Sequence, residues 1–182
     1  TELGLGVFTK ELEVELLSNR ADLAVHSLKD MSTETPAGLD VLTVMKREDP
    51  RDVLVSRGGL KLADLAPGAI IGTSSPRRAA LVQALRPDIA VAPIRGNVET
   101  RLRKLNEGSF DAIVLAAAGL IRLGLQTEVT EFFDPMRFTP AVGQGAVALQ
   151  GRSDDEALAT LLEPLDHADT HEAVLAERAF LV

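Results

Sequence analysis

The sequence predicts an α/β fold whose sheet strands run largely parallel. Short β-branched runs alternate along the chain with stretches of helical period, which is typical of this class. Turn signals such as Gly58-Gly59 and Pro67-Gly68 separate the runs. The 182 residues, of which 46% are hydrophobic and 25% charged, suffice for one domain or two small lobes.

Seven short runs predict strands because each is apolar and mostly rich in Val, Ile or Leu. They cover residues 21–25, 39–45, 52–56, 69–72, 89–94, 111–115 and 145–150.

Helical patterns fill most of the intervals. Residues 8–20 place Leu12 and Leu16 on one side and acidic residues near the other. After the strand at 69–72, Ser75 can cap a helix and Pro76 suits its first turn, so we expect a helix to about residue 86. Further helices are expected at residues 98–105, 116–123, 154–162 and 170–182.

Composition excludes several classes of protein. The longest apolar run, residues 113–121, is far shorter than the ~20 residues of a membrane span. Aromatic residues make up 3%, too few for a surface that stacks nucleic-acid bases, and the net charge of −8 opposes polyanion binding. The absence of cysteine excludes a disulfide framework and fits a reducing compartment, so we expect a cytoplasmic protein.

Positive charge is concentrated in one segment. Residues 77–104 hold seven basic and two acidic residues, a local charge of +5, whereas the remaining 12 basic and 25 acidic residues sum to −13. A basic segment in an acidic protein predicts a focused anion site.

Four polar clusters follow strand candidates, where open α/β sheets place their ligands. They are His26–Asp30, Thr73–Arg78, Arg95–Arg101 and Val142–Gly145. Their equivalent positions predict a shared cleft.

Each cluster also has a structural interpretation. Thr73, Ser74 and Ser75 could offer hydroxyl and backbone N–H groups to an anion, or Ser75 could serve only as an N-cap. Arg77 and Arg78 suit carboxylates or phosphates but could equally be solvated.

The other clusters also allow both a functional and a structural interpretation. Arg95-Gly96-Asn97 could admit a ligand to the backbone or form a plain turn before a basic helix. Asp30 could act on a cation or a leaving amine, or cap a turn. We expect His26 to be packed, and no metal site at His167 and His171.

In combination the clusters resemble the porphobilinogen deaminase (hydroxymethylbilane synthase) family. The matching stretches run in order over nearly the whole chain. They are F-T-K-E-L-E (8–13), D-L-A-V-H-S-L-K-D (22–30), R-E-D-P-R-D (47–52), G-T-S-S-P-R-R (72–78), R-G-N-V-E-T-R-L (95–102), D-A-I-V-L-A-A-A-G-L (111–120), P-A-V-G-Q-G-A (140–146) and A-E-R-A-F-L (176–181).

The resemblance implies two lobes like those of type II periplasmic binding proteins, with mixed, mostly parallel sheets flanked by helices. Domain 1 would comprise residues 1–45 plus 146–165, and domain 2 residues 50–140. Residues 166–182 would begin domain 3. The chain would cross between lobes near residues 45–50 and 140–145, and the lobes would close around the ligand.

The resemblance also implies a transferase that joins four porphobilinogen molecules into hydroxymethylbilane and releases ammonia, a step of haem biosynthesis. A dipyrromethane cofactor would be attached to a cysteine beyond residue 182, and the protein would be a monomer without nucleic-acid or membrane partners. Asp30 would be catalytic. The residues that would bind substrate and cofactor are Phe8, Ser27, Lys29, Thr73, Ser74, Ser75, Arg77, Arg78, Arg95, Gly96, Arg101, Arg122 and Gln144.

Some positions depart from the family pattern. Leu5 stands where many relatives have lysine, Pro76 replaces a common leucine, and Gln150 stands where an acid is common. Both ends of the sequence look cut, so we expect this chain alone to be inactive. The alternatives are a non-catalytic two-lobed protein that binds a small carboxylate and, less favoured, a nucleic-acid module that uses residues 77–104.

Overall fold

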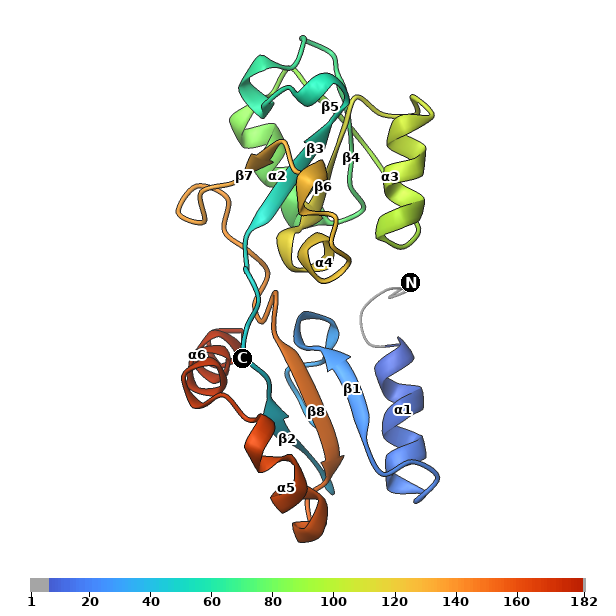
Figure 1. Cartoon of the computed structure of the whole chain (residues 1–182), viewed down its shortest axis with the longest axis vertical. Helices are drawn as coiled ribbons and strands as arrows, with labels where there is room; N and C mark the ends of the chain where they lie inside the picture. The colour runs from blue at the N-terminus through green and yellow to red at the C-terminus, as the bar shows by residue number, and fades with distance from the viewer. Residues whose placement is uncertain (1–6, 182) are drawn as a thin grey trace. The chain divides into compact units, whose positions relative to one another are not determined.

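The computed structural model describes residues 7–181, with side chains from residue 9 onward, and has the expected α/β composition. Contacts between residues divide the chain into two units (Figure 1). Unit 1 comprises Thr1–Glu48 and Val142–Val182, and unit 2 comprises Asp49–Ala141. Residues 166–182 therefore group with unit 1, and their assignment to a third domain stays a prediction, as do the other domain boundaries. Leu5 lies outside the described residues.

Unit 1 contains a three-stranded sheet and three α-helices. The strands are β1 (Ala24–Ser27), β2 (Leu39–Val44) and β8 (Val147–Arg152), in the order β1-β8-β2. The helices are α1 (Val7–Leu17), α5 (Glu156–Leu162) and α6 (Ala168–Ala179). Short 3₁₀ turns cover Leu28–Asp30 and Glu163–Leu165. Apart from end positions, the strands and α-helices are the predicted ones, whereas the 3₁₀ turns were not predicted.

Unit 2 contains a five-stranded sheet in the order β5-β4-β6-β3-β7. Its strands are β3 (Asp52–Ser56), β4 (Ile70–Gly72), β5 (Ala90–Ala92), β6 (Ala112–Ala116) and β7 (Glu131–Phe132). Its helices are α2 (Pro76–Leu85), α3 (Val98–Asn106) and α4 (Ala117–Arg122). Three 3₁₀ turns lie at Arg57–Gly59, Leu62–Asp64 and Gln126–Glu128. The sequence did not predict β7, because two residues are too few to form a pattern.

The prediction of mostly parallel sheets is wrong. Among the described strands, β8 is antiparallel to β1 and β2, and β3 is antiparallel to β6 and β7. Within residues 7–181 the parallel pairs are β4 with β5 and β4 with β6. Strand direction depends on which distant segment lies alongside, and β8 returns to unit 1 to lie between β1 and β2. A short apolar run contains no signal for that choice.

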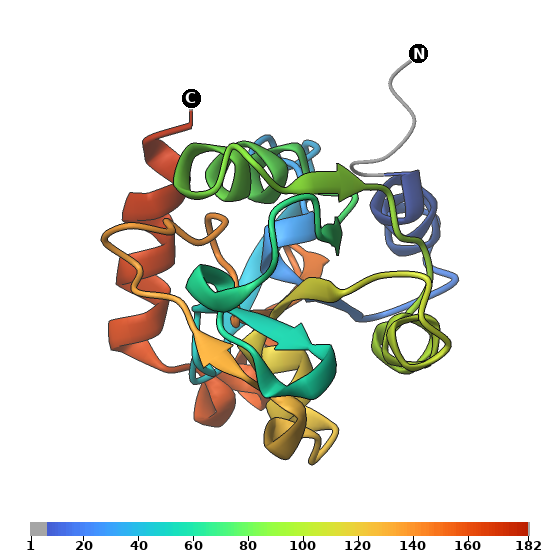
Figure 2. The same cartoon turned by 90° about the horizontal axis from the view of Figure 1, so that it is seen from above.

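Both faces of the unit 2 sheet are covered by helices. Leu54, Ile71 and Val114 pack with Val82 of α2 in one apolar cluster. Val53 and Val55, the neighbours of Leu54 along β3, belong to a second cluster with residues of α3 and α4. Because side chains alternate along a strand, the two clusters lie on opposite faces, as Figure 2 shows for α2 and α4.

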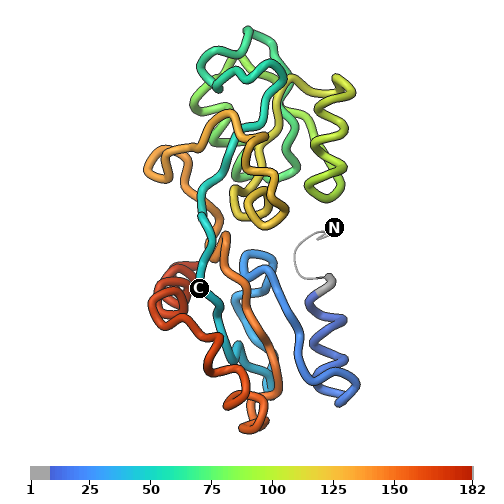
Figure 3. The backbone as a smooth tube through the Cα atoms, viewed as in Figure 1, coloured from blue at the N-terminus to red at the C-terminus, as the bar shows by residue number. Residues whose placement is uncertain are grey.

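The last helix of unit 1 holds the ends of the two segments that lead to unit 2. Val174 of α6 is buried in a cluster with Leu28 and Val44. From the same helix Glu177 forms a two-point ion pair with Arg47 and accepts a hydrogen bond from Gly143 N at 2.8 Å. Figure 3 traces both segments, at residues 45–48 and 142–146. Glu177 thereby links the outgoing and returning chain.

None of the helices described is long and apolar enough to cross a bilayer.

Candidate functional site

A rigid turn presents Asp30 at the end of β1. The Leu28 side chain is buried, and the Leu28 N–H donates to Ala146 O at 3.1 Å. Gly143, at φ +67°, lies so close that a Cβ there would be 2.9 Å from Leu28 Cγ. Two residues later the Asp30 side chain is exposed, and within residues 7–181 the structure gives its carboxylate no hydrogen bond or ion pair. The turn therefore holds an available carboxylate on a fixed backbone.

The other predicted residues of unit 1 occupy different environments. Ser27 is exposed at the end of β1, and Lys29 is half-buried. Gln144 is fully buried, and its main-chain oxygen accepts a hydrogen bond from Arg47 Nε at 2.9 Å. The predicted contribution of the Gln144 side chain to a cleft stays a prediction. Phe8 lies on α1, and its role stays a prediction.

His26 is packed, as predicted. Its Nε2 lies 2.9 Å from Gln150 Oε1, and both side chains are buried in the β1–β8 pair. His167 caps α6 by accepting from Thr170 N, and His171 pairs with Asp166. Within the described part of the chain, no three His, Cys, Asp or Glu side chains gather where they could hold a metal ion.

The hydroxyl oxygens of the loop after β4 are engaged by main-chain groups of the protein. Ser74 Oγ donates to Ile94 O at 2.7 Å and accepts from Ile94 N at 3.0 Å. Thr73 Oγ1 accepts from Ser75 N, and Ser75 Oγ accepts from Arg78 N at 3.4 Å. The N-cap interpretation of Ser75 is therefore confirmed, with Pro76 in the first turn of α2. Anion binding by these three residues stays a prediction.

Arg77 and Arg78, in the first turn of α2, both bind the buried carboxylate of Asp52. Asp52 Oδ1 lies 2.7 Å from Arg78 Nη2 and accepts from Arg78 Nε at 2.9 Å, and Arg77 Nη1 lies 2.7 Å from Asp52 Oδ2. Burial lowers the pKa of Arg78, the attraction of Asp52 opposes this, and repulsion by Arg77 and Arg101 adds to it. Two guanidinium groups thus bind one carboxylate, and the charge of a third, Arg101, acts on Arg78.

The turn after β5 holds the remaining predicted cations. Arg101 Nε donates to Gly96 O at 2.8 Å, and Lys104 Nζ donates to Arg95 O at 3.0 Å. Burial lowers the pKa of Arg101. Within the described residues the exposed Arg95 guanidinium makes no hydrogen bond or ion pair. Arg95 and Arg101 thus have more donors free for a ligand than Arg77 and Arg78. Arg122 ends α4 on the surface.

Replacement of Gly96 is expected to disrupt this turn. In Gly96→Ala, a Cβ would lie 2.5 Å from Thr100 Cγ2 at a backbone φ of +120°. We expect a loss of about 1–3 kcal/mol in the free energy of unfolding, measured by urea denaturation. Gly124→Ala is the matched control, because Gly124 also has positive φ (+70°) but no atom within 4 Å of the added Cβ. Equal losses in the two variants would contradict a clash at Gly96.

The sequence did not predict that Asp52 binds Arg77 and Arg78. We call the predicted arginines of unit 2, Arg77, Arg78, Arg95 and Arg101, the arginine cluster. Asp52 lies within the R-E-D-P-R-D stretch, and it is the one acidic residue of a strand that is otherwise apolar until Ser56. A buried carboxylate is unfavourable without a nearby cation. An acidic residue at the start of an apolar strand was therefore the sequence signal for a basic partner.

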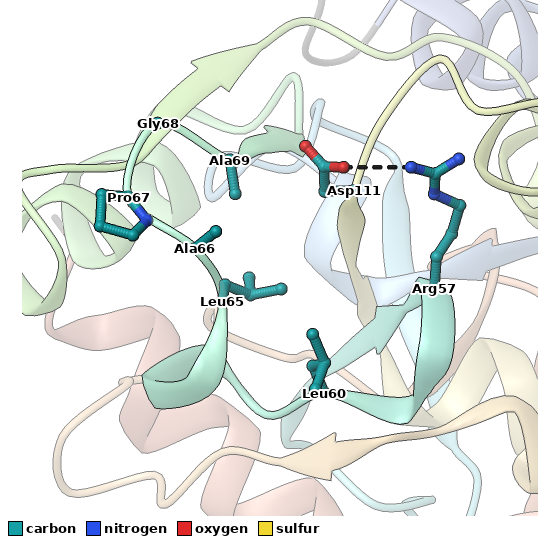
Figure 4. Close-up of a pocket in the computed structure, with 8 residues that line it drawn as sticks. All are labelled: Arg57, Leu60, Leu65, Ala66, Pro67, Gly68, Ala69 and Asp111. Atoms are coloured by element: carbon teal, nitrogen blue, oxygen red, sulfur yellow. Dashed lines mark hydrogen bonds and ion pairs between the residues drawn. The ribbon is translucent and has the colours of Figure 1, made fainter.

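A separate pocket of about 440 Å³ lies among residues that begin or follow strands at the other end of the unit 2 sheet (Figure 4). Arg57 and Asp111 form an ion pair of 3.2 Å at its wall, and apolar residues such as Leu60 and Leu65 complete it. It contains none of the predicted site residues.

Comparison with known proteins identifies the family. A sequence model described as "Porphobilinogen deaminase, dipyromethane cofactor binding domain" matches residues 2–160. The chain is 56% identical over 178 residues to a porphobilinogen deaminase of Syntrophobacter fumaroxidans and 52% identical over 175 residues to one of Thermus thermophilus. These alignments cover 98% and 96% of the chain but 58% of each relative.

Solved structures resemble the chain in fold. An ABC-transporter periplasmic substrate-binding protein from Coxiella burnetii superposes with a TM-score of 0.57 at 17% identity, over 91% of this chain and 77% of that one. The expected likeness to periplasmic binding proteins is therefore confirmed. The family match and the two relatives show that the chain belongs to the porphobilinogen deaminase family, and the fold agrees with this.

Proposed function

We propose that the protein containing this chain is a porphobilinogen deaminase, which condenses four porphobilinogen molecules into hydroxymethylbilane. In each condensation the aminomethyl C–N bond of one pyrrole breaks, and ammonia leaves with a proton. The resulting cationic methylene carbon bonds to the free α-carbon of the next pyrrole, which loses a proton. In the final step the bond between the terminal methylene carbon and the group that still holds it is hydrolysed: water supplies the hydroxyl to that carbon and a proton to the departing group.

The available carboxylate of Asp30 is the observation that carries this proposal. An acid on a fixed turn can accept hydrogen bonds from pyrrole N–H groups and protonate the departing amine. As a carboxylate it then lies where positive charge develops, and it stabilises the cation without reorganisation. The rigidity of the Leu28 turn supports this role.

The arginine cluster of unit 2 suits the periphery of the substrate. Porphobilinogen carries an acetate and a propionate, so every added unit brings two negative charges into an acidic protein. Arg95 and Arg101 offer free guanidinium donors, which match carboxylates in charge and geometry. We infer that these two arginines bind substrate carboxylates while Asp30 acts on the amine. Their convergence on one substrate stays a prediction.

The same donor set fits a dipyrromethane cofactor, which carries acetates and propionates of the same kind. Arg95, Arg101 and the Ser27–Lys29 segment would hold those groups. When bound, the cofactor supplies the pyrrole that is extended. This chain's own residues bind the carboxylates, orient the rings and carry the proton at Asp30.

Assay of the full-length protein with porphobilinogen tests the proposal. We expect ammonia release together with hydroxymethylbilane formation, and no sustained turnover by residues 1–182 alone. We also propose that the protein is a cytoplasmic monomer, to be checked by fractionation and light scattering. Absence of ammonia release by the full-length protein would refute the enzyme assignment.

The fold favours a second candidate, a non-catalytic protein that binds a small carboxylate. Its support is the likeness to a periplasmic substrate-binding protein. Such a protein would bind porphobilinogen or a simple dicarboxylate and release it unchanged.

A further inference from the structure

We infer that Asp52 is a positioning residue for carboxylate binding by Arg77: its buried carboxylate holds the guanidinium groups of Arg77 and Arg78 in place, and the partly exposed Arg77 is the one that faces substrate. This inference rests on the proposed function, since the ligand is taken to be a carboxylated pyrrole.

The backbone of Asp52 is held on both sides. Asp52 is the first residue of β3, where it pairs with Ala116 of β6, and its carbonyl accepts from Phe133 N at 3.0 Å. The side chain is completely buried. A carboxylate fixed in this way can set the position of mobile groups that bind to it.

The two carboxylate oxygens are divided between two arginines. Oδ1 binds Arg78 through Nε and Nη2, and a third nitrogen, Nη1, donates to Val114 O at 3.2 Å. Oδ2 binds Arg77 Nη1, which also donates to Thr139 O. Arg78 is thereby fixed at all three guanidinium nitrogens, and Arg77 is held by one hydrogen bond to Thr139 O and by the ion pair with Asp52 Oδ2.

Charge balance gives Asp52 a second effect. Arg78 is buried and repelled by Arg77 and Arg101, so three cations would be unfavourable in this place without an acid. Asp52 compensates one charge and leaves the cluster positive toward a ligand. The positioning effect and the charge effect of Asp52 can be separated experimentally, because they predict opposite changes in KM when the carboxylate is neutralised.

The decisive variant is Asp52→Asn in the full-length protein. It adds one positive charge to the cluster, so charge alone predicts an unchanged or lower KM for porphobilinogen. Loss of positioning predicts the opposite, a KM raised about tenfold or more with a smaller change in kcat, because the arginines bind ground state and transition state alike. A purely structural ion pair would reduce the folded fraction and leave KM unchanged.

Asp52→Glu provides the second variant, for the case in which Asp52→Asn does not fold. It keeps the charge but moves the carboxylate by one methylene, and we expect KM again to rise several-fold. Asp111→Asn is the matched control, since Asp111 pairs with Arg57 at the other end of the same sheet and lies outside the cluster. We expect it to retain the wild-type KM.

An NMR measurement separates this inference from the proposed function. The Nε–H signal of Arg78, which donates to Asp52 Oδ1, should be resolved and slow to exchange with water in the wild type, should lose that protection in Asp52→Asn, and should keep it in Asp111→Asn. If the wild type releases no ammonia, the proposed function fails and this signal still decides whether Asp52 fixes Arg78. Wild-type KM in both Asp52 variants, or an Nε–H signal unaltered in Asp52→Asn, would overturn the inference.

Discussion

Asp30→Asn is expected to reduce kcat by about 10²- to 10⁴-fold, the contribution typical of a general acid or base. Asparagine has the size of aspartate and can still accept hydrogen bonds, but it can neither donate a carboxyl proton nor compensate a cation. The arginines of unit 2 are untouched, so KM for porphobilinogen should change little. Ammonia release under saturating substrate measures the effect.

Asp40→Asn is the appropriate control for this experiment. Asp40 is an exposed carboxylate on β2 of the same unit, so its replacement causes the same change in net charge. It should retain wild-type kcat. If Asp30→Asn also retained kcat, or if it altered KM alone, Asp30 would be a binding group and the non-catalytic alternative would be favoured.

Glu177→Gln is expected to destabilise unit 1 by about 1–2 kcal/mol, the range of a charge-assisted hydrogen bond discounted for partial exposure. Glu177 accepts from both terminal nitrogens of Arg47 and from Gly143 N, and 34% of its side chain is exposed. Glutamine retains one acceptor oxygen and leaves Arg47 without its counter-charge. Glu172→Gln, on the exposed part of the same helix, should have no effect on urea denaturation.

The Glu177 interaction also predicts a pH dependence. Burial raises the pKa of this carboxyl, but the hydrogen bonds from Arg47 and Gly143 outweigh it and hold the pKa below its ordinary value of 4.5. A carboxyl with a lowered pKa stabilises the fold above the unfolded value and loses that contribution as pH falls through the folded value. Wild type and Glu177→Gln should therefore differ in stability at neutral pH, and this difference should shrink as the pH falls below 4.5. A difference that persists undiminished in acid would contradict the ionic contribution.

Most helices and strands could be predicted from sequence because their signals are local. The Ser75 cap and Pro76 define the start of α2 within a few residues, and β3 and β6 are marked by continuous apolar runs. The polar residues proposed for the site, on the turns after β1, β4 and β5, could be predicted for the same reason. Polar residues that follow buried strands are visible without any knowledge of their neighbours.

The identity of the site's internal partners could not be predicted in this way. Asp52 and Arg78 are 26 residues apart, and Arg77 and Thr139 are 62 apart. From the sequence, the Ser74 hydroxyl could bind a ligand. In the structure it donates to the main-chain oxygen of Ile94 and accepts from the main-chain N–H of the same residue. The sequence shows which donors and acceptors a side chain has. Folding decides which groups they bind, because the partners are distant in the chain.

The sequence by itself determined the α/β class, the helix caps, the acidic residue at the end of β1 and the basic segment that follows β4, because each depends on residues close together in the chain. Tertiary structure alone decided the strand directions, the burial of Gln144 and the commitment of Arg77 and Arg78 to Asp52. These depend on which distant segments pack side by side, and a buried charge then takes the nearest opposite charge, since leaving either one alone in the interior would be far less favourable.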